Sequence, residues 1–304
     1  MEFFRKTNIN FQGKRRIAIT CSSLFILAGL VSLIVRGGPN YSIDFSGGTG
    51  ITLRFAKPIS EGQVRSILNE IKLGDSEVKT IAGGGSHPDI LIRVKETAVE
   101  TGTVTLVENN IRKAIPDNPF EVLQIEKVGP KVGKELKGKA VWAMVVSLIG
   151  ILIYLAWRFE FKFAVGAVIA TAHDLLVMMG LFSIMNLEMS LAIVAAFLTI
   201  AGYSINDTVV VYDRIRENIK KLRSATFFDV INISINETLS RTILTGSTTL
   251  MVLIVLFFLG GQVIHDFSFA LLIGILVGTY SSIFIAAPIL LEWEQISGTK
   301  RKKM

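Results

Sequence analysis

Six long apolar runs constrain this chain more than any other feature of its sequence. A helix needs about 20 residues to cross the hydrocarbon core of a bilayer, and each run is of that order. Half of the 304 residues are hydrophobic, and because they are gathered in blocks, a water-soluble globule is not expected. The predicted membrane helices cover residues 17–35, 140–157, 163–184, 189–211, 243–260 and 267–291.

The basic residues fall on alternate sides of these runs. Lys and Arg cluster ahead of the first run, between the second and third, after the fourth and after the sixth, whereas the short loops 186–188 and 261–266 contain none. By the positive-inside rule, residues 1–16 and the basic tail 292–304 are expected in the cytoplasm, and residues 36–139 on the outer side. This distribution accounts for the net charge of +7 without a nucleic-acid partner.

Residues 36–139 have the pattern of a soluble domain. After Gly50, short alternating strands replace the long apolar blocks, and Ser60 with Gln63 forms a capping box ahead of an amphipathic helix. Two strands, a second helix and a last strand at 120–125 follow, which gives the order β-α-β-β-α-β. We therefore expect a polytopic α-helical membrane protein with six transmembrane helices and one external ferredoxin-like α+β domain after the first helix.

Polar residues line one face of the fourth and of the fifth predicted helix. Ionisable groups within a bilayer are costly and normally face a bundle interior or a wet cavity, so they are presumed functional. Helical spacing therefore predicts a proton pathway formed by Asp207 and Arg241. The alternatives are a structural ion pair that only fastens two helices, or an Arg241 side chain that extends to the membrane interface. The predicted supporting polar groups are Tyr203, Asn206, Thr245 and Thr248, together with the third-helix residues His173 and Asp174.

His173 and Asp174 are adjacent in the third predicted helix, and their sequence context fits a proton relay and a helix-packing contact equally well.

Residues 212–242 include apolar residues at every fourth position from Phe227 to Leu239. This repeat predicts an amphipathic cytoplasmic segment that lies along the membrane interface before the fifth helix.

Four strings, in this order along the chain, carry a family resemblance. They are Asp44, Phe45, Gly47, Gly48 and Thr49 after the first run, Gly129 and Pro130 before the second, His173 and Asp174 in the third, and Gly202 to Thr208 continuing into Asp213, Arg214 and on to Asn218. Together they resemble the motifs of the SecD/SecF family, a branch of the resistance-nodulation-division superfamily, and they cover nearly the whole chain.

The resemblance implies a subunit of the accessory complex of the Sec preprotein translocase, in the bacterial inner membrane. Such a subunit forms a six-helix half that pairs with SecD and uses the proton-motive force to promote protein export. The implied partners are SecD, the SecYEG channel, the translocating preprotein and membrane lipids. The resemblance also implies that Asp207 and Arg241 are the proton-responsive residues, which are the two that helical spacing selects.

Two other function classes were open to the sequence. An enzyme is not expected, because the H-E-x-x-H, G-x-S-x-G and G-x-x-x-x-G-K-[ST] motifs are absent, and with them the usual zinc, serine and nucleotide chemistries. No metal or cofactor is expected either. A half-unit of a proton-driven small-molecule or lipid exporter of the same superfamily is the alternative function. A companion subunit with six spans would favour the export complex, whereas self-assembly would favour the exporter.

Overall fold

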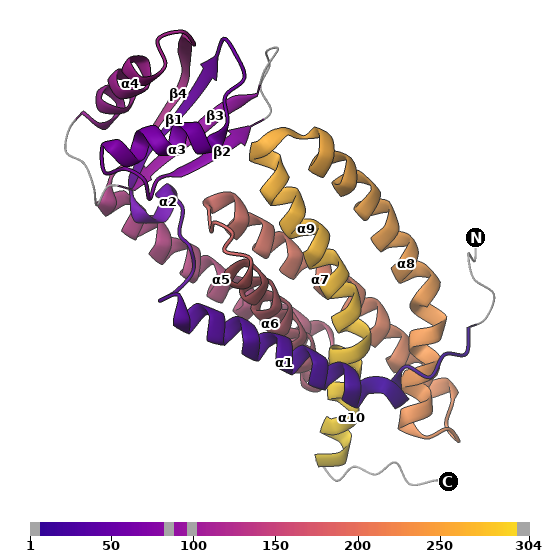
Figure 1. Cartoon of the computed structure of the whole chain (residues 1–304). Helices are drawn as coiled ribbons and strands as arrows, with labels where there is room; N and C mark the ends of the chain where they lie inside the picture. Colours follow the sequence, from indigo (N-terminus) through magenta and orange to yellow (C-terminus); the bar gives the residue numbers. More distant parts are fainter. Residues whose placement is uncertain (1–6, 82–87, 96–101, 297–304) are drawn as a thin grey trace.

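Six helices long and apolar enough to cross a membrane make up most of the computed structural model, which describes residues 7–81, 88–95 and 102–296 (Figure 1). The chain is therefore a polytopic α-helical membrane protein. The sixth helix contains a π-helical stretch, η2, between two α-helical parts. The membrane helices are α1 (Arg15–Val35, preceded by the turn η1, Gln12–Lys14), α5 (Pro130–Arg158), α6 (Phe161–Ile184), α7 (Leu191–Lys221), α8 (Phe227–Leu259) and the run of α9 (Gly261–Ser281), η2 (Ser282–Ala286) and α10 (Ala287–Ile296).

A small α+β domain sits on one end of the helical bundle (Figure 1). Its sheet has the order β2-β3-β1-β4 with all neighbours antiparallel, so the expected ferredoxin-like arrangement is confirmed. The capping box also forms, because Ser60 and Gln63 each accept a hydrogen bond from the other's backbone N–H. The elements are β1 (Gly48–Phe55), α3 (Glu61–Glu70), β2 (Glu77–Ile81), β3 (Asp89–Lys95), α4 (Thr103–Ala114) and β4 (Phe120–Val128).

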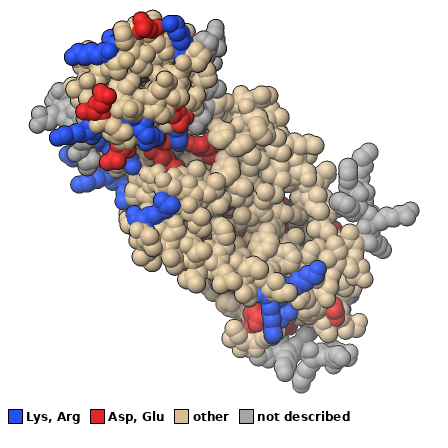
Figure 2. Space-filling view, viewed as in Figure 1, with Lys and Arg blue, Asp and Glu red and all other residues tan. Residues whose placement is uncertain are grey.

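Charged side chains mark the two ends of the molecule. Figure 2 shows Lys, Arg, Asp and Glu gathered over the α+β domain and at the opposite end of the bundle, with a largely uncharged band between them. Large apolar side chains such as Leu27, Val146 and Val252 are exposed on the membrane helices. Lipid chains can cover such a surface. The helices also pair their own backbone N–H and C=O groups by hydrogen bonds, as the interior of a bilayer requires.

Several helices extend beyond the apolar runs that predicted them. α5 begins at Pro130 rather than at residue 140, so the α+β domain ends before residue 139, and α7 continues to Lys221 rather than ending at residue 211. Both extensions carry charges, and a search for apolar residues therefore misses them. Proline at the first helical position, as in α5, favours a helix start because it has no N–H to leave unpaired.

The predicted interfacial segment 212–242 is wrong as a separate element. Its first part is the end of α7, and from Phe227 it is the start of α8, which Thr226 caps by accepting from the Asp229 N–H. The apolar stripe of this segment packs on protein, because Ile231 and Ile235 are buried in one cluster with Ile215 of α7. A four-residue apolar repeat alone does not distinguish a protein contact from a lipid contact.

Candidate proton site

Asp207 lies on α7 with its carboxyl inside the bundle. The residue is 3% exposed, and its Oδ2 atom has no hydrogen-bond partner among the described residues. Thr279 of α9 lies beside the carboxyl, and Arg241 of α8 is close enough to interact with it electrostatically. A buried ionisable group in a membrane helix is costly, which makes Asp207 a functional candidate.

Arg241 does not form a direct ion pair with Asp207. Its side chain is exposed at the surface of the chain, and no nitrogen–oxygen contact within 4.0 Å joins the two among the described residues. Helical spacing gives the face on which each residue lies, but it does not give the rotation of α8 relative to α7. The interaction between the two charges therefore acts at longer range, where it depends strongly on what lies between them.

The predicted supporting residues differ in their surroundings. Tyr203 lies beside Thr249 of α8 and near Asp207, whereas Asn206 is exposed. The hydroxyls of Thr245 and Thr248 donate to carbonyls of their own helix, Arg241 O at 2.9 Å and Leu244 O at 3.1 Å respectively. Their hydrogens are therefore not directed at Asp207. The hydroxyl beside the carboxyl is that of Thr279, which sequence spacing within one helix does not identify.

Asp174 on α6 is fully buried at the meeting point of four helices. Its Oδ2 accepts from Ser204 of α7 at 2.5 Å and from Ser281 of α9 at 2.8 Å. Its Oδ1 lies 2.9 Å from Nδ1 of His173, whose Nε2 lies 3.0 Å from the Ser22 hydroxyl of α1. The pair thus connects α1, α6, α7 and α9. Sequence reasoning misses the three serines, because isolated hydroxyls in membrane helices follow no diagnostic spacing.

The string from Asp44 to Thr49 forms the joint between the sheet and the membrane helices. Helix α2 (Ile43–Ser46) is followed by Gly47 and Gly48, which have φ angles of 76° and 150° that favour glycine. The Asp44 carboxylate accepts from the backbone N–H of Leu191, the first residue of α7, at 2.9 Å. A carboxylate there satisfies a first-turn donor and complements the helix dipole. Asp44 therefore caps the helix that carries Asp207.

The remaining motif residues surround this joint. Phe45 and Thr49 are buried, and a Cβ on Gly133 of α5 would lie 2.8 Å from the Phe45 carbonyl oxygen. Gly129 is the residue before α5, and Pro130 is its first residue. Gly133 thus allows the first turns of α5 to lie in close contact with α2, and Pro130 begins the helix.

Five charged side chains, here called the junction cluster, connect the α+β domain to the ends of the membrane helices. Arg93 of β3 donates to Glu188, in the loop before α7, at 2.7 Å, and lies 3.4 Å from Glu77 of β2. Lys79 of β2 lies 2.6 Å from Glu77 and 3.5 Å from Asp266 of α9. The cluster therefore holds the sheet against α9 and the loop that leads into α7.

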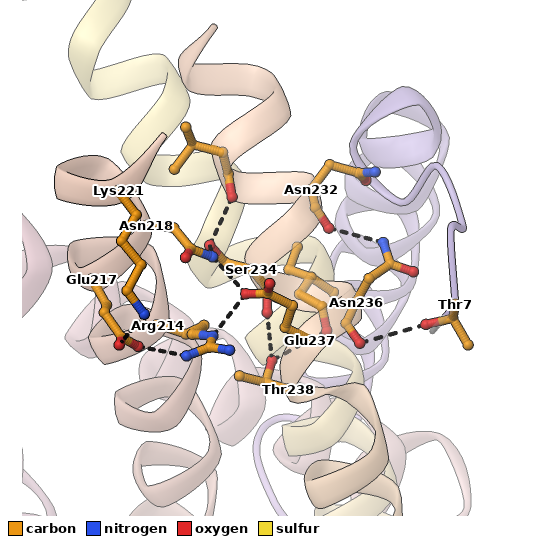
Figure 3. Close-up of polar contacts among 12 residues, drawn as sticks. Thr7, Arg214, Glu217, Asn218, Lys221, Asn232, Ser234, Asn236, Glu237 and Thr238 are labelled. Atoms are coloured by element: carbon orange, nitrogen blue, oxygen red, sulfur yellow. Dashed lines mark hydrogen bonds and ion pairs between the residues drawn. The ribbon is translucent and has the colours of Figure 1, made fainter. Parts of the chain in front are cut away.

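At the other end of the bundle, Arg214 ties α7 to α8 (Figure 3). Its Nε donates to Glu237 of α8 at 2.7 Å, and its Nη1 donates to Glu217 at 2.6 Å. Asn218 also donates to Glu237, at 2.6 Å. Asp213 is exposed beside this network. The second half of the fourth motif thus fixes α7 against the helix that carries Arg241.

Two family models match the chain. The model of the SecD/SecF GG motif matches residues 31–59, and that of the C-terminal part of the protein export membrane proteins SecD and SecF matches residues 107–296. Among curated relatives, the protein translocase subunit SecF of Thermodesulfovibrio yellowstonii is 41% identical over 96% of this chain and 96% of its own length. The SecF subunit of Magnetococcus marinus is 44% identical over 99% of this chain and 96% of its own length.

Solved structures give the same assignment. A crystal structure of SecDF from Thermus thermophilus, a translocon-associated membrane protein, superposes with a TM-score of 0.84 at 37% identity and covers 95% of this chain. This chain spans only 39% of that SecDF chain. A second SecDF structure, in a super-membrane-facing form, gives a TM-score of 0.72 at 37% identity, with 98% and 40% covered. The chain therefore belongs to the SecD/SecF family of protein export membrane proteins.

Proposed function

We propose that the chain is the SecF-type half of an accessory complex of the Sec translocase. In this proposal it pairs with SecD in the bacterial inner membrane and uses the proton-motive force to promote the export of preproteins. Similarity to SecF translocase subunits over nearly the whole chain supports the assignment. The SecDF chain that it resembles is longer, since this chain covers 39% of it, which leaves room for a SecD-type half. The other proposed partners are the SecYEG channel, the preprotein and membrane lipids.

The proposed orientation follows from the charges. The ends of α1 and α10 that lie away from the sheet are flanked by basic residues, which favours a cytoplasmic position for both termini. The α+β domain then lies outside, where an exported polypeptide emerges.

The observation that supports the proton role most directly is the contrast between Asp207 and Arg241. Asp207 is 3% exposed with an unpartnered Oδ2, whereas the neighbouring Arg241 is exposed on a membrane helix. An exposed guanidinium near the end of a membrane span is costly unless water or a partner satisfies it, and in this proposal a second membrane subunit on this face of α8 covers it. At the interface between the two subunits, approach of Arg241 to Asp207 favours the ionised carboxylate, and withdrawal of Arg241 favours proton uptake by Asp207. A charge that crosses about 100 mV releases roughly 2.3 kcal/mol to drive this exchange.

Movement of α7 would reach the α+β domain directly. The first residue of α7 is bonded to Asp44, and the loop before it is bonded to Arg93 through Glu188. The backbone of this loop is also paired with the domain, because Ser42 N–H donates to Met189 O at 3.0 Å and Met189 N–H donates to Asn40 O at 2.8 Å. A change at Asp207 that displaces α7 along its axis would therefore pull on the domain.

The proton role is tested with Asp207→Asn, which removes the ionisable group and keeps the side-chain shape. Proton-gradient-dependent release of a preprotein from membrane vesicles is expected to be lost, while Asp117→Asn, in an exposed turn of the α+β domain, leaves release unchanged. Full release by Asp207→Asn would refute the proposal. Arg241→Lys is expected to impair release despite its retained charge, because an ammonium lacks the planar fork of a guanidinium. Arg223→Lys, in the exposed turn after α7, is the matched control.

The partners are tested by purifying the tagged chain from membranes in mild detergent. A second six-span subunit and a translocation channel are expected with it. Recovery of the chain only as a self-assembly would favour the exporter function instead.

A further inference from the structure

The hydrogen bonds around His173 and Asp174 form a chain whose directions can be assigned from donor and acceptor chemistry. The chain ends at the carbonyl oxygen of Ala18 on α1, which accepts from the Tyr280 hydroxyl of α9 at 2.8 Å. A carbonyl can only accept, so the single hydroxyl hydrogen of Tyr280 is used there. The Ser22 hydroxyl lies 3.1 Å from the Tyr280 oxygen, and Ser22 must therefore donate its own hydrogen to Tyr280.

This direction fixes the state of one imidazole nitrogen. His173 Nε2 lies 3.0 Å from Ser22 Oγ. Because the Ser22 hydrogen is engaged with Tyr280, the hydrogen in this contact has to come from the ring. If the three contacts Tyr280–Ala18, Ser22–Tyr280 and His173–Ser22 are hydrogen bonds at the same time, His173 carries a hydrogen on Nε2 and donates it to Ser22.

The contact between His173 and Asp174 then requires a further proton. Nδ1 and Oδ1 are 2.9 Å apart. In a neutral imidazole with Nε2–H, Nδ1 is a lone pair, and a lone pair facing an ionised carboxylate is repulsive. The contact is attractive if the imidazole is doubly protonated, or if the carboxyl is protonated and donates to Nδ1. Both states hold one proton more than a neutral imidazole beside an ionised carboxylate.

The other contacts of Asp174 are compatible with both states. Ser204 donates to Oδ2 at 2.5 Å, and Ser281 can donate either to Oδ2 at 2.8 Å or to the Gly278 carbonyl at 3.0 Å. In the described part of the chain, no Lys or Arg makes an ion pair or hydrogen bond with the pair. The titratable groups near it are Cys21 on α1, Tyr280 on α9, and Asp207, which follows Ser204 by one turn of α7.

An open groove of about 410 Å³ borders the histidine side of the pair. It lies between α1, α6 and α9, with Ser22, His173 and Tyr280 among apolar neighbours such as Phe25 and Val177. The lining is largely apolar, and Phe25 and Leu276 are exposed on the same flank, so lipid chains rather than water are expected to occupy it.

We propose that His173 and Asp174 form a second proton-binding site in this chain, separate from Asp207, and that its proton controls the hydrogen bonds between α1 and α9. When the proton leaves, His173 becomes an Nδ1–H donor to the carboxylate, and its Nε2 becomes an acceptor. Ser22 then turns its hydrogen to Nε2, and the Ser22–Tyr280 hydrogen bond is lost. Proton release therefore removes one link between α1 and α9.

The test is a measurement of the protonation state of His173 in the full chain. The protein is labelled with ¹⁵N-histidine in lipid nanodiscs, and the His173 signals are identified by their loss in His173→Gln. Near neutral pH, Nε2 is expected to carry hydrogen, with either Nδ1 also protonated or an infrared band of a protonated carboxyl that Asp174→Asn removes. A neutral Nδ1–H imidazole beside an ionised Asp174 at every pH between about 5 and 10 would overturn the proposal.

A second variant tests the direction of the chain. Tyr280→Phe frees the Ser22 hydrogen to reach Nε2, which favours the unprotonated pair, so the proton affinity of His173 is expected to fall about tenfold. Tyr154→Phe, on the exposed surface of α5, is expected to leave the affinity unchanged. An unchanged affinity in Tyr280→Phe would also overturn the proposal. Neither readout involves translocation, so either result leaves the proposed role of Asp207 to be judged separately.

Discussion

The Arg93 guanidinium of β3 donates to the Glu188 carboxyl at 2.7 Å and so joins the sheet to the loop that leads into α7. Burial, and next the neighbouring Glu77, raise the pKa of Glu188 to about 8, against the attraction of Arg93 and Lys79. The pKa of Glu77 is lowered: burial opposes the shift, but the contacts with Glu188 and Lys79 outweigh it. At neutral pH, the two carboxyls are therefore expected to hold one proton, on Glu188.

This arrangement predicts that the α+β domain loosens from the bundle as the pH rises through about 8. The pKa of Glu188 is higher in the docked state than its ordinary value of 4.5, so docking binds a proton. The stabilisation of the docked domain by this proton is full below the ordinary pKa of Glu188 and is lost as the pH rises through its pKa in the docked state. Above that pH, two ionised carboxylates repel one another at Arg93. Hydrogen exchange at the Met189 and Leu191 amides, corrected for the intrinsic pH dependence, measures the loosening.

The matched variants separate this effect from general alkaline destabilisation. Glu188→Gln resembles the protonated carboxyl and is expected to keep slow exchange at Met189 above pH 8. Glu70→Gln, exposed on α3, is expected to keep the wild-type pH dependence. If Glu188→Gln loosens at the same pH as the wild type, the junction cluster is not the cause.

The capping contact of Asp44 predicts a local effect on α7. Asp44→Ala leaves the Leu191 N–H without its acceptor at 2.9 Å and removes a charge that complements the helix dipole. Loss of a capping side chain costs about 1 kcal/mol, so exchange of the first α7 amides is expected to accelerate roughly fivefold. The control Asp75→Ala lies in an exposed turn of the domain. Equal exchange at Leu191 in both variants would contradict the capping role.

The close approach of α1 to α6 predicts a strong requirement for glycine. A Cβ on Gly29 would overlap the Gly180 backbone, because the two glycines face each other across the contact. Gly29→Ala is therefore expected to force the helices apart, and overpacking of this kind costs about 1–3 kcal/mol. Gly150→Ala, on α5, has nothing within 4 Å of its added Cβ and should not lower the unfolding temperature in detergent. A wild-type unfolding temperature for Gly29→Ala would show that the helices can adjust.

The features that follow from the sequence are those set by local chemistry. Each apolar run indicates a membrane helix on its own, and the contact of Ser60 with Gln63 spans three residues. The six helices and the ferredoxin-like order of the external domain could therefore be predicted. Helix ends are harder, since the extensions of α5 and α7 carry charged residues and do not belong to the apolar runs.

The features that do not follow from the sequence depend on distant elements meeting. Asp44 and Leu191 are 147 positions apart, and nothing near either residue predicts the contact. Spacing along α7 places Asp207 on a polar face, but the hydroxyl beside it comes from Thr279 of α9. For the same reason, helical spacing selects Asp207 and Arg241 but does not give the distance between them, because the spacing within each helix does not fix the rotation between two helices.

The N-terminal segment is bound to α8 by two asparagines, which gives a last prediction (Figure 3). The Asn236 side chain accepts from the Ile9 N–H at 2.8 Å and donates to the Ile9 carbonyl at 2.9 Å, and Asn232 accepts from the Phe11 N–H at 2.9 Å. These bonds contact only the backbone of the segment. They hold it on the same helix that carries Arg241, which follows Asn236 by little more than one turn.

Replacement of both asparagines by Ala is expected to release the segment without unfolding the bundle. Each hydrogen bond contributes about 1 kcal/mol, so exchange of the Ile9 and Phe11 amides should accelerate by more than tenfold. Asn109→Ala, exposed on α4, serves as the control. Because the segment leads directly into α1, its release should also increase exchange in the first turn of α1, while amides in β1 keep their protection. Unchanged exchange at Ile9 in the double variant would mean that apolar packing, such as that of Phe11 on Phe284, holds the segment instead.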